Sequence, residues 1–405
     1  MGSCKVSAFR RRDSVGWEVK SATLLGRRFE AGFECNRSKF AVVLTTVGKG
    51  KEMKVFLICN RQGVGGATLN AALICSEFSN NGIDTKIFFI QERDATFKPQ
   101  PERQITLHRG TATTAGWAKA FFSFMRYVWR EKPDAIIGFT PAANIFAGLS
   151  RCVSWSTRCI ATQRNPSTEQ SAAGALCDKL FGTIGVYKRN IAVSHAVKDS
   201  FFSYPVSYRR RISVVHNATP SLAYTEASKY HSRLRYELPE GYLILGCIAR
   251  LHPQKNIGFA IELLTFMPNA FLLICGGGPE ESKLKDMVAR LQVGCRVKFV
   301  GEVHGVAITE FYRAIDVLLF PSHFEGFGRT LVEALSQGVP IVSNELPVAK
   351  EVAGDAAWFA PLEHSQWLAK IEQAVGDNDL QKRVQRSRLY STEKMVKGYM
   401  EAISR

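Results

Sequence analysis

The sequence predicts an α/β protein built from two doubly wound domains, each a parallel sheet covered by helices. At about 150 residues per domain, a chain of 405 residues is too long for one small domain. A strand, a glycine-rich turn, a helix and a second strand follow one another from Lys54, and the same alternation restarts at Leu243. Two such Rossmann-like domains facing each other predict a central cleft at the carboxyl ends of their strands.

The first domain is assigned to residues 53–220. Its opening unit is the apolar run KVFLICN, a helical pattern within 61–82 and the strand TKIFFI, which together form a βαβ unit. The short apolar runs that follow, separated by helical patterns, predict four more strands, at 135–139, 158–162, 190–193 and 212–215.

The second domain is assigned to residues 221–380. Its first part belongs to a weakly periodic stretch at 219–238, which we interpret as a linker because prolines lie at both of its ends. Residues 381–405 end in a helix at about 392–403 that no strand follows, and we expect this helix to return to the first domain. The expected strands of the second domain are 243–249, 271–275, 297–300 and 317–320, and its helices are 257–264, 280–291 and 308–314.

Composition limits the class of protein and its partners. Hydrophobic residues make up 46% and charged residues 22%, as in ordinary folded proteins, and no apolar run is long enough to cross a membrane. The net charge of +17 predicts attraction to nucleic acid, acidic lipid or phosphorylated substrates. Ten scattered cysteines without a C-x-x-C pair indicate reduced thiols, so we expect a cytoplasmic protein that can bind the inner face of the membrane peripherally.

Residues 1–52 are rich in arginine and poor in periodicity, and a clean apolar strand begins just after Met53. We interpret this leader as a disordered or non-native extension with no part in the fold. The functional alternatives for this leader are a transit peptide and a basic arm that binds a membrane surface.

Glycines follow the first predicted strand, in the sequence Gly63-Val64-Gly65-Gly66-Ala67. Glycine lets a ligand approach the backbone, and the N-terminus of the next helix favours a phosphate, so Gly65 and Gly66 are candidate ligand contacts. A tight structural turn explains the same pattern equally well.

A second candidate site follows the first strand of the second domain, in the sequence ARLHPQKN at 249–256. Arg250 and Lys255 lie five residues apart in a loop between a strand and a helix, where both can reach one diphosphate. Solvated loop charge is the alternative, but the expected position at the cleft favours binding.

The strongest pattern is FPSHFEGFGRTLVEA at 320–334, a glycine-flanked loop that runs into a helix. Glu325 would lie in the loop at the mouth of the cleft and Glu333 about two turns into the helix. Two carboxylates so placed can contact the two ends of one elongated ligand, because an acid–base pair acting on one small substrate would be closer together.

The segment EGFGRTLVE at 325–333 resembles the E-x7-E element of retaining glycosyltransferases of family 4, which have the two-domain GT-B fold. The similarity extends through ARLHPQKN, LLICGGGPE, VKFVGEV, DVLLFPS and GVPIVS, and VVHNATP stands where the family commonly has a "YNG" turn. It covers roughly residues 53–400, and its carboxy-terminal motifs are the specific ones.

The resemblance implies a role for each matching residue. Arg250 and Lys255 would hold the diphosphate of a nucleotide-sugar, Glu325 would bind sugar hydroxyls, and Glu333 would accept hydrogen bonds from the ribose. It makes Glu325, Arg250 and Lys255 the catalytic candidates. The remaining donor contacts would be Gly65, Gly66, Gly277, Val303, Gly326, Phe327, Gly328, Arg329, Thr330 and Leu331.

The implied reaction is metal-independent, retaining transfer of a sugar, from UDP or GDP, to a glycan or lipid-linked acceptor. It would serve the synthesis of cell-surface polysaccharide, lipopolysaccharide or glycolipid, with no cofactor beyond the donor substrate. A non-catalytic or epimerising GT-B protein and a basic nucleic-acid-binding protein are the alternatives, although no nucleic-acid-binding motif is present.

Two residues of the first domain are candidate acceptor or phosphate contacts. Family members often carry a histidine after a strand of this domain, and the comparable stretch here, GFTPAAN, offers Asn144 to the cleft instead. The segment QRNP at 163–166 resembles an E-R-N-x-P element, so Arg164 could meet a phosphate or the acceptor, or equally form a structural salt bridge.

The segment GWAKAFFSFMRYVWREK at 116–132 interleaves aromatic and basic residues. This pattern is typical of a helix that lies on an anionic membrane surface, and also of a helix that packs its aromatic face on a sheet.

Overall fold

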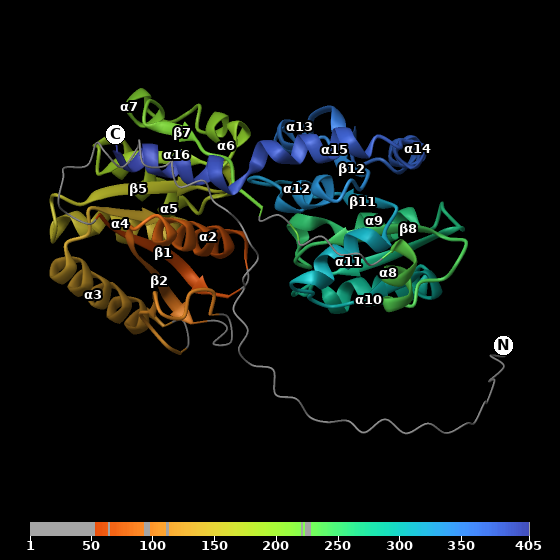
Figure 1. The fold of residues 1–405 in the computed structure, drawn as a ribbon, viewed down its shortest axis with the longest axis horizontal. Helices are drawn as coiled ribbons and strands as arrows, with labels where there is room; N and C mark the ends of the chain where they lie inside the picture. The colour runs from red at the N-terminus through yellow and green to blue at the C-terminus, as the bar shows by residue number, and fades with distance from the viewer. Residues whose placement is uncertain are drawn as a thin grey trace, which may run out of the picture. The chain divides into compact units, whose positions relative to one another are not determined.

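The computed structural model describes residues 53–63, 65–92, 98–110, 113–219, 222 and 228–404. The described chain forms two parallel sheets, each covered by helices on both faces (Figure 1). This confirms the predicted class of two Rossmann-like α/β domains. The leader at 1–52, and the interpretation given to it, lie outside the described residues.

The first sheet has seven strands in the order β3-β2-β1-β4-β5-β6-β7, and every neighbouring pair is parallel. Its central strands are almost continuously apolar, as expected for strands buried on both faces. The strands are β1 (Lys54–Gln62), β2 (Asp84–Glu92), β3 (Gln104–Thr106), β4 (Ala135–Gly138), β5 (Arg158–Gln163), β6 (Tyr187–Ala192) and β7 (Ile212–Val214).

Four helices of this domain, α3 to α6, begin at short polar side chains that cap them. The side-chain oxygens of Thr113, Thr140, Ser171 and Ser194 each accept a backbone N–H of the helix they precede. The helices are α2 (Gly66–Asn80), α3 (Thr114–Glu131), α4 (Pro141–Leu149), α5 (Ala172–Thr183), α6 (His195–Ser200) and α7 (Val206–Arg209).

The second sheet has six parallel strands in the order β10-β9-β8-β11-β12-β13. They are β8 (Leu243–Ile248), β9 (Ala270–Cys275), β10 (Val297–Phe299), β11 (Val317–Phe320), β12 (Ile341–Asn344) and β13 (Trp358–Ala360). The helices are α8 (Lys229–Arg235), α9 (Ile257–Leu263), α10 (Glu281–Arg290), α11 (Val306–Ala314), α12 (Arg329–Ser336), α13 (Pro347–Ala353), α14 (His364–Val375), α15 (Leu380–Ser387) and α16 (Thr392–Ser404).

The segment interpreted as a linker contains a helix, which corrects that interpretation for its described part. Ser228 caps α8, and α8 packs against α11. Arg233 bonds Asp316 at 2.6 Å, and the Tyr236 hydroxyl donates to the Ala307 carbonyl at 3.0 Å. The helix has only seven residues, too few for a clear apolar period, so tertiary contacts define it more than local sequence does.

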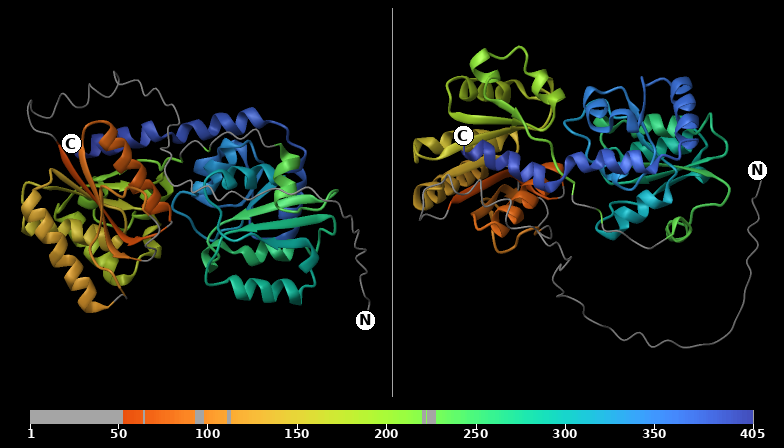
Figure 2. Two further views of the ribbon diagram at one scale, coloured as in Figure 1. Left: turned by 60° about the horizontal axis from the view of Figure 1, so that its bottom comes forward. Right: turned by 45° about the horizontal axis from the view of Figure 1, so that its top comes forward.

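The last helix, α16, packs on elements of the first domain, against α2 and β5 (Figure 2). The ring of Tyr399 stacks on Phe139 with centroids 5.9 Å apart, and Arg158 donates to the Ile403 carbonyl at 2.7 Å. Because the helix follows the second domain in the chain, it ties the two domains together a second time.

Candidate functional site

The predicted binding residues of the second domain lie in loops at the carboxyl ends of three adjacent strands. β8 is followed by the loop with Arg250 and Lys255, β9 by Gly276–Pro279, and β11 by the loop with Glu325. Since the three strands are neighbours in one parallel sheet, their loops meet at one edge.

Lys255 and Glu325 are brought together across two of these loops. The Lys255 ammonium pairs with Glu325 Oε1, which also accepts a hydrogen bond from the Ser322 hydroxyl at 3.2 Å. The Glu325 side chain is only 9% exposed. The Gln254 carbonyl accepts the N–H of His323 at 2.8 Å, which fixes one loop against the other.

Arg250 is exposed, and within the described residues its guanidinium makes no ion pair or hydrogen bond. A cation without a protein partner can turn toward an anionic ligand without breaking an existing bond. The loop therefore offers one fixed positive charge and one free positive charge.

Glu333 is buried in α12 and engaged by two donors. Arg329 Nε bonds Glu333 Oε1 at 2.8 Å, and the Tyr312 hydroxyl bonds Oε2 at 2.9 Å. Burial raises the pKa of Tyr312 well above its ordinary value, and the nearby carboxylate raises it further, so Tyr312 stays a proton donor. Tyr312, on α11, was missed by sequence reasoning because no motif places it beside Glu333.

Two glycines after β9 are required by close backbone approach. A Cβ at Gly276 would lie 1.9 Å from the Ala249 carbonyl oxygen, and one at Gly278 would lie 2.3 Å from that of Leu251. Gly276 has φ +131°, a conformation that other residues rarely adopt. Between them, a Cβ at the predicted contact Gly277 would lie 3.3 Å from Glu302 Oε1.

The other predicted donor contacts surround the start of α12. Gly328, with φ +79°, precedes the helix; Phe327 and Leu331 are buried, whereas Arg329 and Thr330 are half-buried. Val303 is half-buried in the loop after β10 and packs against the core.

Gly326 lies against the first domain. A Cβ there would come within 1.6 Å of the Arg164 carbonyl oxygen, and the Gly326 carbonyl accepts the Ser194 hydroxyl at 2.8 Å. The loop of Glu325 is thus held on one side by its own domain and on the other by the first domain.

Gly65 and Gly66 begin α2 with open space around them, since an added Cβ at either would meet nothing within 4 Å. Gly65 also provides no side-chain cap for the helix. Packing within the described chain therefore does not explain these glycines, in contrast to Gly276 and Gly326.

Asn144 is buried, and the structure corrects the expectation that it faces a cleft. Its Oδ1 accepts the N–H of Thr162, and its Nδ2 donates to the Thr162 carbonyl, both at 3.1 Å. The amide is used to fasten α4 to β5, where unpaired backbone groups would be costly.

Arg164 has no carboxylate partner among the described residues, so the salt-bridge alternative is not what the structure contains. Its Nη2 donates to Asn217 Oδ1 at 2.9 Å, and its guanidinium lies 5.6 Å from the centre of the Phe139 ring. Its Nη1 is buried without a partner. An unused buried donor is compatible with binding an oxyanion.

Helix α3 has features of both alternatives given for residues 116–132, a helix packed on the sheet and a helix on a membrane surface. Ala120, Phe124 and Val128 are fully buried against the sheet. Phe122 and Trp129 are 69% and 65% exposed. In the part of the chain that is described, no helix is both long and apolar enough to span a bilayer.

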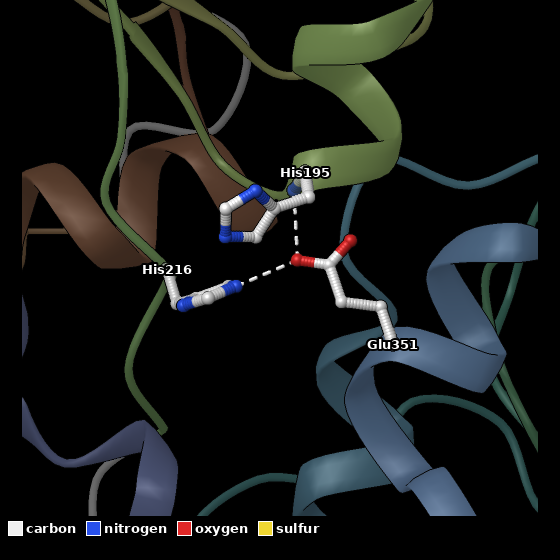
Figure 3. A group of neighbouring side chains, drawn as sticks. All are labelled: His195, His216 and Glu351. Carbon is white, nitrogen blue, oxygen red and sulfur yellow. Dashed lines mark hydrogen bonds and ion pairs between the residues drawn. The ribbon is translucent and has the colours of Figure 1, made fainter.

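A further cluster joins the two domains. It consists of His195 at the start of α6, His216 after β7, and Glu351 on α13, whose side chains converge (Figure 3). Each side chain offers one atom of a kind that binds metal ions, and these atoms lie within 4.8 Å of one another. However, His216 Nε2 lies 2.7 Å from Glu351 Oε1, a hydrogen-bond distance, whereas two ligands of a tetrahedral zinc ion would lie roughly 3.3 Å apart. The arrangement is that of a hydrogen bond between an imidazole and a carboxylate.

Comparison with known proteins gives a match within the second domain. Residues 231–388 match the family described as "Glycosyl transferases group 1". Those residues contain every loop of the candidate site that belongs to the second domain.

Curated relatives are similar over part of the chain. One is the lipopolysaccharide core biosynthesis mannosyltransferase LpsB of Rhizobium meliloti, 35% identical over 117 residues, or 27% of this chain and 33% of the relative. Another is the O-antigen biosynthesis glycosyltransferase WclY of Escherichia coli, 24% identical over 173 residues, or 43% of this chain and 48% of the relative. The chain thus matches half or less of the length of these relatives.

Solved structures match over the whole fold. The Anabaena protein Alr3699/HepE, in complex with UDP and glucose, aligns with a TM-score of 0.76 and 18% identity, covering 87% of this chain and all of that one. The glycosyltransferase WaaG, involved in lipopolysaccharide biosynthesis, aligns with a TM-score of 0.66 and 16% identity, covering 86% and 99%. The chain has the GT-B fold of these glycosyltransferases.

Proposed function

We propose that this protein is a metal-independent retaining glycosyltransferase, similar to those of family 4, that transfers a sugar from a UDP- or GDP-sugar to a glycan or lipid-linked acceptor. The observation that carries the proposal is the loop cluster at the carboxyl ends of β8 and β11, where Lys255 pairs with Glu325 beside the unpaired Arg250. The match of residues 231–388 to a glycosyltransferase family supports it.

In this proposal the leaving nucleoside diphosphate is neutralised by two side-chain cations. The guanidinium of Arg250 turns onto the diphosphate with its forked donors, and the Lys255 ammonium is shared between the diphosphate and Glu325. Charge stabilisation of this kind contributes most where donors are already in place before the reaction. Ser322 and Lys255 fix Glu325, so that its remaining lone pairs can accept sugar hydroxyls.

Glu333 binds the ribose in this proposal. Arg329 and Tyr312 hold the carboxylate in place from two sides, and each oxygen keeps a lone pair for a hydroxyl donor. The acceptor hydroxyl enters on the face that the nucleotide leaves, so the proposal names no side-chain nucleophile.

The proposal includes a site of action at an anionic membrane surface. The exposed rings of Phe122 and Trp129 on α3 stand among Lys119, Arg126 and Arg130, and the chain carries a charge of +17. Such a surface suits an acceptor anchored in lipid. The curated relatives act in lipopolysaccharide core and O-antigen biosynthesis, as their names state.

The test of the function is a transfer assay. The protein is incubated with UDP- and GDP-sugars and lipid-linked or oligosaccharide acceptors, and the anomeric configuration of the product is read by NMR. The proposal predicts a product with the anomeric configuration of the donor. An inverted product contradicts the retaining mechanism, and tight binding of RNA without any nucleotide-sugar turnover would favour the nucleic-acid alternative.

The membrane surface is tested by sedimentation with vesicles of phosphatidylglycerol and phosphatidylcholine. We expect binding that weakens with salt and falls when Phe122 and Trp129 are both replaced by serine. The matched control is Phe266→Ser, an exposed phenylalanine of the second domain. Equal loss in both proteins would contradict a role for α3.

A further inference from the structure

Several of the contacts between the two domains meet at one carboxylate, that of Glu351. Its Oε1 accepts the backbone N–H of His195 at 2.7 Å, and its Oε2 accepts that of Ala196 at 2.9 Å. Both N–H groups belong to the first turn of α6, so a side chain of the second domain caps a helix of the first domain. His216 Nε2 bonds Oε1 of the same carboxylate at 2.7 Å (Figure 3).

The backbone of Glu351 is fixed from the opposite side. Arg386 donates to the Glu351 carbonyl at 2.5 Å and to that of Val352 at 2.9 Å, and the Tyr390 hydroxyl lies 3.1 Å from the Glu351 carbonyl. The side chain therefore has a rigid base in the second domain, and any movement of α6 relative to α13 breaks its bonds.

The same contacts connect to the loop that contains Glu325 and Gly326, called the donor loop below. Ser194, which directly precedes the capped helix α6, donates to the Gly326 carbonyl, and Gly326 adjoins Glu325. The rings of His216, Tyr390 and Phe327 pack together, with centroids 5.4 Å apart for His216 and Tyr390, 6.0 Å for His216 and Phe327, and 5.3 Å for Phe327 and Tyr390. Thus His216 contacts the loop proposed to bind the sugar through Phe327, and Glu351 connects to that loop through His216 and through α6.

We propose that Glu351 is a positioning residue that locks the two domains together through α6 and His216 and thereby holds the Glu325–Gly326 loop in its donor-binding geometry. This inference rests on the proposed function for its second half, the effect on the donor. Its first half, the effect on domain geometry, stands on the contacts alone.

The chain provides its own probes for a test. Cys152 in the first domain and Cys295 in the second are exposed, whereas Cys59, Cys75, Cys159, Cys247 and Cys275 are buried. Burial raises the pKa of Cys247 to about 12, which keeps that thiol unreactive at neutral pH. A reference protein with Cys4→Ser, Cys35→Ser and Cys177→Ser therefore takes spin labels at Cys152 and Cys295.

The experiment measures the distance distribution between the two labels by pulsed electron resonance, together with the affinity for UDP and GDP by calorimetry. Glu351→Gln keeps the shape of the side chain but replaces one of its two oxygens with an NH2 group. That group cannot accept the N–H of His195 or of Ala196, as the carboxylate oxygen does. We expect a broader or shifted distance distribution and about tenfold weaker nucleotide binding, the effect of losing roughly one hydrogen bond. Glu345→Gln, at an exposed glutamate beside α13, is the matched control and should change neither.

An unchanged distance distribution in Glu351→Gln would overturn the inference. So would a changed distribution with unaltered affinity, because the donor loop would then be independent of the lock. If the reference protein binds neither nucleotide, the proposed function fails, while the distances still decide whether Glu351 sets the domain geometry. Should Glu351→Gln not fold, His216→Gln, which leaves both bonds to α6, is expected to cause a smaller change in the same direction.

Discussion

The glycine-rich turns of the two domains differ in what surrounds them. In the second domain, Gly276 and Gly278 press on the backbone of the neighbouring loop, and Gly326 presses on Arg164 of the first domain. In the first domain, Gly65 and Gly66 have open space where a side chain would be. The donor side of the site is therefore built by close backbone packing, whereas Gly65 and Gly66 leave room for something outside the described chain.

The largest expected effect is on the charged pair of the second domain. Lys255→Ala should lower kcat/KM by about a hundredfold to a thousandfold, because it removes a fixed positive charge from the leaving diphosphate. Glu325→Ala should cause a similar loss of transfer while the fold stays intact. Lys283→Ala, an exposed lysine of the same domain, is the control. Wild-type turnover in either site variant would show that the site is assigned to the wrong residues.

Two alanine substitutions test the difference between the glycine-rich turns of the two domains. Gly276→Ala should destabilise the fold by about 2 to 4 kcal/mol, since it combines a positive φ with a Cβ 1.9 Å from a carbonyl oxygen. Gly66→Ala should leave the free energy of unfolding unchanged or raise it by up to about 1 kcal/mol, because alanine favours a helix. We expect Gly66→Ala to weaken the binding of the donor instead. Chemical denaturation of both variants decides between the two accounts, and equal destabilisation would remove the contrast.

A smaller effect is expected at Tyr312. Tyr312→Phe removes one hydrogen bond to Glu333 and should weaken nucleotide binding by about 0.5 to 1.5 kcal/mol. Calorimetry against the nucleotide that wild type binds measures it, with Tyr230→Phe, an exposed tyrosine, as the control. If affinity is unaltered, Tyr312 does not position Glu333 for the ribose.

The smallest effect depends on pH. Burial raises the pKa of Glu351, but hydrogen bonds from His216 and from the N–H groups of His195 and Ala196 outweigh it and leave this pKa below its ordinary value. A lowered carboxyl pKa stabilises the folded state above the unfolded-state pKa of about 4.3, and this contribution is lost as the pH falls through the folded-state pKa. The extra stability of wild type over Glu351→Gln should thus shrink as the pH falls below about 4, where the folded-state carboxylate takes up its proton. A difference that grows as the pH falls below about 4 would contradict the lowered pKa of Glu351.

The fold was largely predictable because its strands are continuous apolar runs separated by helical periods, as in KVFLICN and TKIFFI. Some short elements were not: α8 has seven residues, and β3 and β13 have three each, too few to carry a period, although the equally short β7 and β10 were predicted from their apolar runs. Their place is set by contacts such as Arg233 with Asp316, which lie far apart in the sequence.

The candidate site was predictable where residue types and spacing specify the chemistry, as in ARLHPQKN and EGFGRTLVE. The contact of Tyr312 with Glu333 and the cluster around Glu351 were not, because they join segments 21 and 135 or more residues apart. Asn144 was misplaced for the opposite reason: it follows a strand closely in the sequence, but it lies in α4 and its amide bonds the backbone of Thr162.

The most direct test of the central claim, a nucleotide-sugar site in the second domain, is thermal unfolding of the protein with UDP, GDP, ADP and CMP, repeated for Glu333→Ala. A nucleotide present at a hundred times its dissociation constant adds about 2.7 kcal/mol of stability, which raises Tm by several degrees. The account predicts that one nucleotide, UDP or GDP, stabilises wild type and not the variant. Stabilisation by none of the four, with stabilisation by RNA instead, would contradict it.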